Sequence, residues 1–186
     1  AVGMQGLGGI EGSLDYAIGY AKERQQFGKP LAELPLMKRN LEDYTTERDA
    51  IRALLMDTIS YYDVFQNLDL KKKLTNDLTK EEEEKLKEAT LWTRKRTPLV
   101  KYYACETHTH LSQRAIQVLG GYGFMKEYPV ERMHRDSFGP LLYEGTSQIQ
   151  ALMALKDLMK YAIKDPKKFL TSVFAKTSGA NQWTED

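Results

Sequence analysis

The sequence predicts an all-α fold, an antiparallel helical bundle with one irregular loop region. Apolar residues recur at steps of three and four residues in several long segments, which is the spacing of one helix face. No segment shows the sustained period-two alternation of a half-buried strand, and no internal repeat is visible. With 186 residues and 41% hydrophobic side chains, the chain is long and apolar enough to bury a core of its own.

Two long helices are predicted in the first part of the chain. The first ends near Phe27, because Gly28 and Pro30 follow it. The second runs from about Leu34 to about Phe65, with inward residues at a mean step of about 3.5, the spacing of helices in bundles. The first inward face consists of Met4, Leu7, Ile10, Leu14, Ala17 and Ala21. The second consists of Met37, Leu41, Tyr44, Arg48, Ile51, Leu55 and Ile59.

The polar segment 67–80, with lysines at positions 71, 72 and 73, is predicted to be an exposed loop. Thr79 and Glu82 have the spacing of a capping box, so a helix is expected to begin there. We interpret the acidic run that follows as a solvated helix face.

Proline and glycine divide the second half of the chain. Thr97 and Pro98 have the pattern of a cap and a first helical residue, so a helix is predicted from Pro98 to the glycines at 120 and 121. Residues 122–145 are predicted to be irregular, with a short helix after Pro129.

A last helix is predicted to follow Thr146 and to be broken by Pro166. The tail after about Thr177 is expected to be mobile. The apolar residues of this helix are Ile149, Leu152, Met153, Ala154, Leu158 and Ala162.

Composition excludes several classes of function. The 27 basic and 26 acidic residues give a net charge of +1, which provides no reason to expect a nucleic-acid partner. The longest apolar runs are too short to span a bilayer. Cys105 is the one cysteine, so no internal disulfide forms, which fits a reducing compartment.

The N-terminal sequence AVGMQGLGGIEGSL lacks the basic region of a signal peptide. It also has neither an initiating Met nor a helix cap before its helical pattern begins. We therefore expect the chain to be a piece of a longer protein.

Two stretches differ from both core and solvent face. The first is Arg24–Pro30, which places an arginine, an amide, an aromatic ring and a glycine turn at a helix end. Arginine can bind a phosphate through two hydrogen bonds, and glycine lets a ligand approach the backbone. An ordinary helix C-terminus, where basic residues match the dipole, explains the pattern equally well.

The second stretch contains three glycines within positions 120–123 and continues to Tyr143–Gln148. Glu144 lies just before a helix that Thr146 or Ser147 caps, where free backbone N–H groups stabilise negative charge. A carboxylate at such a place can act as a general base on an acidic C–H. The alternative is that Glu144 only favours the helix dipole.

The remaining reactive residues point to structural roles. His108 and His110 lie on different helix faces with no matching cluster, so zinc is not expected. His134 is interpreted as a surface or packing residue, and Cys105 as a small buried hydrophobe. Arg135 and Asp136 are interpreted as a local ion pair.

The two stretches, in this order, resemble the acyl-CoA dehydrogenase family. The matching motifs are RQQFGKPL (24–31), QVLGGYGF (117–124), EYPVER (127–132), RD (135–136) and YEGTSQIQ (143–150). The resemblance covers most of residues 1–165. It implies the C-terminal four-helix bundle of a protein whose N-terminal helical and middle β domains are not in this sequence, and a tetramer.

The resemblance implies a role for each motif residue. Glu144 matches the base that removes the α-proton of the acyl thioester while FAD takes the β-hydrogen. The backbone N–H of Glu144 matches a group that helps to hold the thioester carbonyl. Tyr143 and Gly145 match substrate-binding positions. The residues that match contacts to a neighbouring subunit's FAD are Arg24, Gln26, Phe27, Gln117 and Gly121. Those that match contacts to the subunit's own FAD are Thr146 and Gln148.

The resemblance also implies partners and a setting. These are an acyl-CoA substrate, electron-transfer flavoprotein as acceptor, a homo-oligomer, and fatty acid β-oxidation in the cytoplasm, or in the mitochondrial matrix of a eukaryote. The charged stretch 67–87 is longer than the segment that usually connects these helices in the family. Residues 138–140 differ from the commonest family sequence just before the base. A non-catalytic oligomerisation module and an acyl-CoA oxidase-like flavoprotein remain as alternatives. The chain alone is expected neither to hold FAD tightly nor to turn over acyl-CoA.

Overall fold

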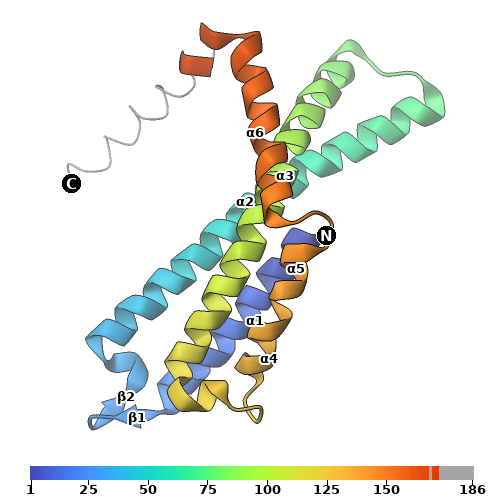
Figure 1. The fold of residues 1–186 in the computed structure, drawn as a ribbon. Coiled ribbons are helices and arrows are strands. Elements are labelled where there is room, and N and C mark those ends of the chain that lie inside the picture. Colours follow the sequence, from blue (N-terminus) through green and yellow to red (C-terminus); the bar gives the residue numbers. More distant parts are fainter. Residues whose placement is uncertain (168, 172–186) are drawn as a thin grey trace.

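The computed structural model describes residues 1–167 and 169–171 and confirms the all-α prediction (Figure 1). Three long helices, α1 (Val2–Glu23), α2 (Pro35–Thr75) and α3 (Lys80–Leu119), form the core, and α1 and α2 both pack against α3. The short helices α4 (Pro129–Asp136) and α5 (Phe138–Leu142) cover α1 and α3. In the described part of the chain, no helix is long and apolar enough to cross a membrane.

A small hairpin follows α1, which ends at Glu23 and not near Phe27 as predicted. Strands β1 (Gln25–Gln26) and β2 (Lys29–Pro30) pair antiparallel. The two turn residues, Phe27 and Gly28, have φ of 52° and 81°. Two positive φ values in a two-residue turn match the twist of a hairpin, and this geometry explains why a glycine stands at position 28. A 3-10 turn, η1 (Leu31–Glu33), leads into α2.

The predicted loop 67–80 is mostly helix, which corrects the sequence interpretation. Helix α2 continues to Thr75 and ends on the left-handed Asn76, so residues 76–79 are the whole connection. Ion pairs at i and i+4, such as Lys73 with Asp69 at 2.6 Å, support this largely exposed and charged end of the helix. Together, the end of α2 and the start of α3 extend beyond α1 as a two-helix arm (Figure 1).

The predicted capping box starts α3. The backbone N–H of Glu82 donates to Thr79 Oγ1 at 3.2 Å, and the N–H of Thr79 donates to Glu82 Oε2 at 2.9 Å. Lys71 Nζ reaches the same carboxylate at 2.7 Å and ties the two helices of the arm together.

Pro98 does not begin a helix, contrary to the prediction, because α3 runs through it without a break. The Thr97 hydroxyl donates to the Thr93 carbonyl within the helix instead of capping a new one. Proline removes one backbone hydrogen bond from a helix interior. Pro98 is buried, so apolar packing compensates for that loss. The predicted end is confirmed, since α3 is capped by Gly120 with φ of 62°.

The region predicted to be irregular contains η2 (Gly120–Phe124), α4 and α5. The short helix after Pro129 is confirmed as α4, whereas α5 was not predicted. Helix α6 (Ser147–Lys164) begins after Thr146 and ends before Pro166, also as predicted. The expected mobile tail after Thr177 lies outside the described residues.

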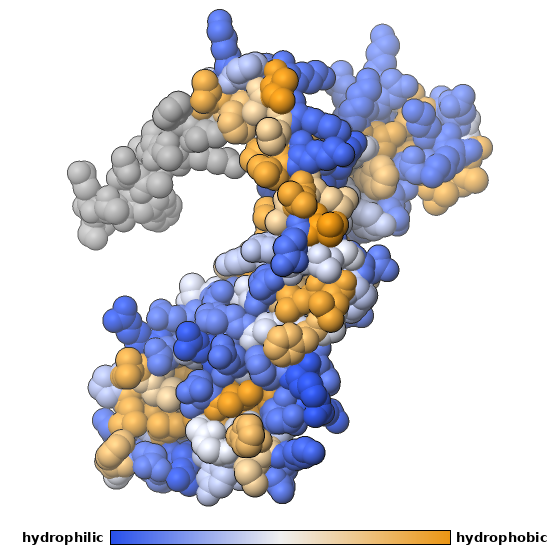
Figure 2. Space-filling view, in the orientation of Figure 1, coloured by the Kyte–Doolittle hydropathy of each residue, from blue (hydrophilic) through white to orange (hydrophobic). Residues whose placement is uncertain are grey.

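Helix α6 turns most of its apolar side chains outward. Gln150 is buried and Asp157 forms an ion pair with Arg94 of α3 at 3.0 Å, so a polar row faces the bundle. Figure 2 shows the resulting hydrophobic surface along α6. Its exposed apolar residues are Ile149, Leu152, Met153, Leu155, Leu158, Met159 and Ile163.

Helices α1 and α3 approach each other closely at glycines. A Cβ added to Gly6 would lie 3.0 Å from the carbonyl group of Ala104. A Cβ added to Gly9 would lie 2.1 Å from Nε2 of His108. The imidazole of His108 therefore occupies the space that the missing side chain of Gly9 leaves.

His108 is a buried base without hydrogen-bond partners. Its side chain is buried, and neither ring nitrogen has a partner among the described residues. Burial lowers the pKa of His108 below the ordinary 6.5, the nearby His134 lowers it further, and Asp136 opposes both. The ring is therefore neutral in the folded chain at neutral pH.

We expect the fold to lose stability in mild acid through His108. Because its folded pKa is depressed, the unfolded chain takes up a proton below about pH 6.5 while the folded chain does not, at a cost of up to about 1.4 kcal/mol per pH unit. Urea unfolding between pH 7.5 and 5 should show that the free energy of unfolding falls with this slope. In His108→Leu the slope should be smaller by the contribution of one proton. An unchanged slope in the variant would assign the effect to other groups.

Candidate functional site

One groove brings together the two motif stretches that lie about ninety residues apart in sequence. It has a volume of about 790 Å³ and lies between the hairpin after α1 and the glycine end of α3. Arg24, Gln26, Gln117 and Gly121 all line it, as the prediction of a shared ligand requires. Phe27 does not, because it stands at the hairpin tip with 89% of its surface exposed.

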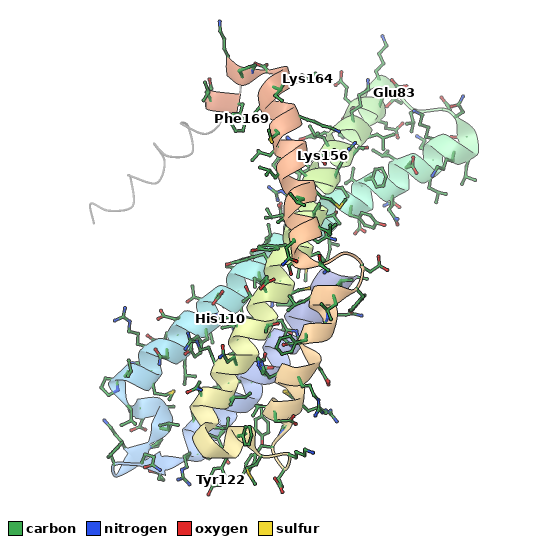
Figure 3. The ribbon with its side chains drawn as sticks, viewed as in Figure 1. Glu83, His110, Tyr122, Lys156, Lys164 and Phe169 are labelled. Carbon is green, nitrogen blue, oxygen red and sulfur yellow. The ribbon has the colours of Figure 1, made fainter. Side chains whose placement is uncertain are left out.

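One cationic side chain, Arg24, lines the groove beside the rings of Tyr122 and Tyr128. The Arg24 guanidinium lies 5.6 Å from the ring centroid of Tyr122, and Tyr122 stacks on Tyr128 at 5.2 Å. Figure 3 shows Tyr122 at this end of the bundle. Helices α1 and α3 both end here, and helix C-termini disfavour anions, so Arg24 is the group that must attract a phosphate. Glu127 also lines the groove.

These residues fit a nucleotide-bearing cofactor such as FAD. No atom comes within 4 Å of a Cβ added at Gly120 or Gly121, so their backbone faces open space. An open backbone, tyrosine rings and one arginine suit a ligand with flat rings and phosphates.

A second site lies on the loop between α5 and α6. Glu144 has φ of 56°, its side chain is exposed, and Gly145 follows with φ of 91°. Thr146 directly precedes the first residue of α6, so free N–H groups at the start of that helix lie next to the carboxylate-bearing loop. Gln148 is exposed in the first turn of α6.

The two sites lie at opposite ends of α1. The Tyr143 hydroxyl on the loop donates to the Gln5 side chain near the start of α1, whereas Arg24 follows its end. Nineteen residues of helix separate these points, about 28 Å at 1.5 Å per residue. The predicted residues therefore form two sites and not one.

Two residues of the second site were missed in the sequence. Lys101 of α3 is buried, and its Nζ donates to the carbonyl of Gly145 at 2.5 Å and to that of Leu141 at 3.5 Å. The Gln150 side-chain amide donates to the carbonyl of Glu144 at 2.7 Å. A signal existed for Lys101, because it lies four residues before Cys105 on the buried stripe of α3, where a charge is unexpected.

The other candidate residues keep structural roles. Cys105 is fully buried, and burial raises the pKa of its thiol, as its interpretation as a hydrophobe requires. His134 Nδ1 lies 3.0 Å from Ser112 Oγ. No group of three or more potential metal ligands occurs in the described ranges.

The predicted ion pair between Arg135 and Asp136 is wrong. Arg135 pairs with Glu131 at 3.1 Å, and Arg132 approaches Asp136 at 3.9 Å. On a helix, side chains four residues apart are neighbours, whereas adjacent ones diverge.

Known proteins similar to this chain include acyl-CoA dehydrogenases and reductases, which are flavoprotein oxidoreductases. Residues 1–159 match the C-terminal domain of acyl-CoA dehydrogenases. The chain belongs to the acyl-CoA dehydrogenase family and corresponds to that domain.

Individual relatives agree with this assignment. The caffeyl-CoA reductase–Etf complex subunit CarC of Acetobacterium woodii is 36% identical over 159 residues, which are 86% of this chain and 35% of that protein. Cyclohexane-1-carbonyl-CoA dehydrogenase of Geobacter metallireducens is 32% identical over 162 residues, 87% of this chain and 36% of that protein. The chain thus spans about a third of the length of these relatives.

A solved structure shows the same fold with its cofactor. The acyl-CoA dehydrogenase from Bacillus anthracis, complexed with FAD, superposes with a TM-score of 0.70 at 26% identity. The match covers 88% of this chain and 27% of that one.

Proposed function

We propose that this domain supplies the catalytic base of an FAD-dependent enzyme that oxidises an acyl-CoA to the 2,3-enoyl-CoA. The observation that carries the proposal is the placement of Glu144. It is an exposed carboxylate on a left-handed loop at the start of α6. Because the chain spans only part of its relatives, the complete reaction is proposed for a larger protein that contains it.

The reaction assigns distinct tasks to this loop. The Glu144 carboxylate removes the α-proton, and its backbone N–H holds the thioester carbonyl as negative charge develops there. Tyr143 and Gly145 lie on either side and shape the acyl site. The β-hydrogen leaves as hydride to FAD, chemistry that no side chain provides.

The two sites are proposed to serve two FAD molecules. Thr146 and Gln148, beside the base, would hold the subunit's own FAD. Arg24 and its groove would bind FAD of a neighbouring subunit, with the cation on its phosphates. The distance of about 28 Å along α1 supports this division, because a groove so far from Glu144 does not belong to the same reacting centre.

The test is anaerobic bleaching of the flavin by a panel of acyl-CoA thioesters, carried out on the complete protein. We expect at least one acyl class to bleach it, with electron-transfer flavoprotein as a competent acceptor. Bound flavin that no acyl-CoA bleaches would favour a non-catalytic module. Rapid peroxide release in air would favour an oxidase.

A reductase is the second candidate. The relative from Acetobacterium woodii is described as a reductase in a complex with Etf. Glu144, as the carboxylic acid, would then protonate the α-carbon of an enoyl-CoA, and reduced flavin would supply the hydride for the β-carbon. Reoxidation of the reduced flavin by enoyl-CoA, faster than its reduction by the saturated thioester, would identify this direction.

The outward face of α6 is proposed to contact another copy in a homo-oligomer. Contiguous apolar surface on a helix marks an interaction site. We expect the chain to self-associate in light scattering, and Leu152→Glu with Leu155→Glu to shift it towards monomer. Glu83→Gln, in the exposed first turn of α3, is the matched control. A monomeric wild-type chain at high concentration would contradict this expectation.

A further inference from the structure

The loop that carries Glu144 is held in an unfavourable backbone conformation. Glu144 and Gly145 are consecutive left-handed residues, with φ of 56° and 91°. A non-glycine residue occupies this region only when its surroundings hold it there. The φ of 91° at Gly145 disfavours any residue with a side chain, and an added Cβ would also displace the Gln150 amide, whose nitrogen it would approach to 2.6 Å.

Both carbonyl groups of this turn are bound by buried side chains from different helices. Gln150 of α6, 8% exposed, donates to the Glu144 carbonyl at 2.7 Å. Lys101 of α3, 6% exposed, donates to the Gly145 carbonyl at 2.5 Å. These two donors thus stabilise the left-handed turn from both sides.

Lys101 also connects the turn to the helix before it. Its ammonium lies 3.5 Å from the carbonyl of Leu141 in the last turn of α5, where a cation is favoured. The segments on both sides of Glu144 therefore share one donor on α3. A buried ammonium group is costly unless it is hydrogen-bonded, and Lys101 donates to one carbonyl of α5 and to one of the loop that follows it.

We propose that Lys101 and Gln150 are positioning residues that set the direction of the Glu144 carboxylate. This inference rests on the proposed function of Glu144 as the base. Neither residue needs to touch the substrate. They act by fixing the two carbonyl groups of the turn, because a base that is misplaced by about 1 Å loses about a hundredfold in rate.

The test combines amide hydrogen exchange with steady-state kinetics. In Lys101→Met, residues 141–150 should exchange about fivefold faster, as loss of one net hydrogen bond predicts. In the complete enzyme, kcat should fall about 10- to 100-fold while KM changes little. Lys101→Arg should recover part of the slow exchange and part of kcat. Gln150→Leu should show the same faster exchange and the same loss of kcat as Lys101→Met. Lys87→Met, exposed on the same helix, should change neither.

Two outcomes separate this inference from the proposed function. Wild-type exchange and kcat in a folded Lys101→Met and in Gln150→Leu would overturn the positioning role. Full turnover in Glu144→Gln would overturn the proposed role of Glu144 as the base. Hydrogen exchange in the Lys101 and Gln150 variants would then still test whether these side chains hold the turn. If Lys101→Met does not fold, Gln150→Leu and Lys101→Arg provide both measurements.

Discussion

Replacing Glu144 by glutamine should lower kcat by about 10²- to 10⁴-fold, the range that a general base contributes. Glutamine keeps the size of the side chain and leaves the backbone N–H and carbonyl of the turn in place. It cannot accept the α-proton at neutral pH. KM for the acyl-CoA should therefore change much less than kcat, because binding relies on groups that the substitution retains.

Exchange of the α-proton of a bound acyl-CoA with D₂O isolates this step from hydride transfer. Glu144→Gln should abolish the exchange, and Glu144→Asp should retain part of it, since a carboxylate one methylene shorter is present but misplaced. Glu83→Gln, on the exposed first turn of α3, should behave as wild type. Undiminished exchange in Glu144→Gln would place the base on another residue.

Local patterns in the sequence predicted local structure well. The capping box at Thr79, the end of α3 at Gly120 and the short helix after Pro129 all lie where the pattern placed them. Each depends on interactions within a few residues, so the sequence alone contains the cause.

The predictions that failed depended on contacts between helices, which local sequence patterns do not reveal. Pro98 is a helix breaker by local rules, but its burial in the bundle keeps α3 continuous. The segment after Phe65 is mostly polar and charged, and its helix is supported by ion pairs within and between the two helices of the arm. The apolar residues of α6, which the sequence pattern also identified, are mostly exposed, because periodicity alone does not indicate whether the chain itself covers such a face.

The candidate site shows the same difference between what local motifs predict and what only helix packing determines. Motifs predicted Glu144 and Arg24 as candidate site residues, because those motifs are continuous in sequence. Lys101 contributes to the Glu144 loop from 43 positions earlier, and no motif links the two. Only the packing of α5 and α6 against α3 brings them together.

Replacing Gly9 by alanine should destabilise the fold, although alanine favours helices more than glycine does by about 1 kcal/mol. The added Cβ would lie 2.1 Å from Nε2 and 2.2 Å from Cε1 of His108. That ring is buried and has little space to move, so α1 and α3 must separate or the ring must leave its rotamer. Overpacking of this kind costs about 1–3 kcal/mol, which exceeds the gain in helix propensity.

Gly8→Ala and Gly19→Ala are matched controls on the same helix. No atom lies within 4 Å of a Cβ added at either position, so both should raise the free energy of unfolding by up to about 1 kcal/mol. Urea unfolding of the three variants should therefore give opposite signs for Gly9 and for its two controls. Stabilisation by Gly9→Ala would show that the interface between α1 and α3 is looser than the structure indicates.

A double-mutant cycle identifies the cause. Removing the ring in His108→Ala leaves a cavity and should be destabilising by itself. In that background, Gly9→Ala fills part of the space that the imidazole vacated, so it should be neutral or stabilising. A coupling free energy of about 1–3 kcal/mol between the two positions would assign the cost to this contact. Additive effects would place it in the helix backbone instead, because a backbone effect of Gly9→Ala does not depend on the residue at position 108.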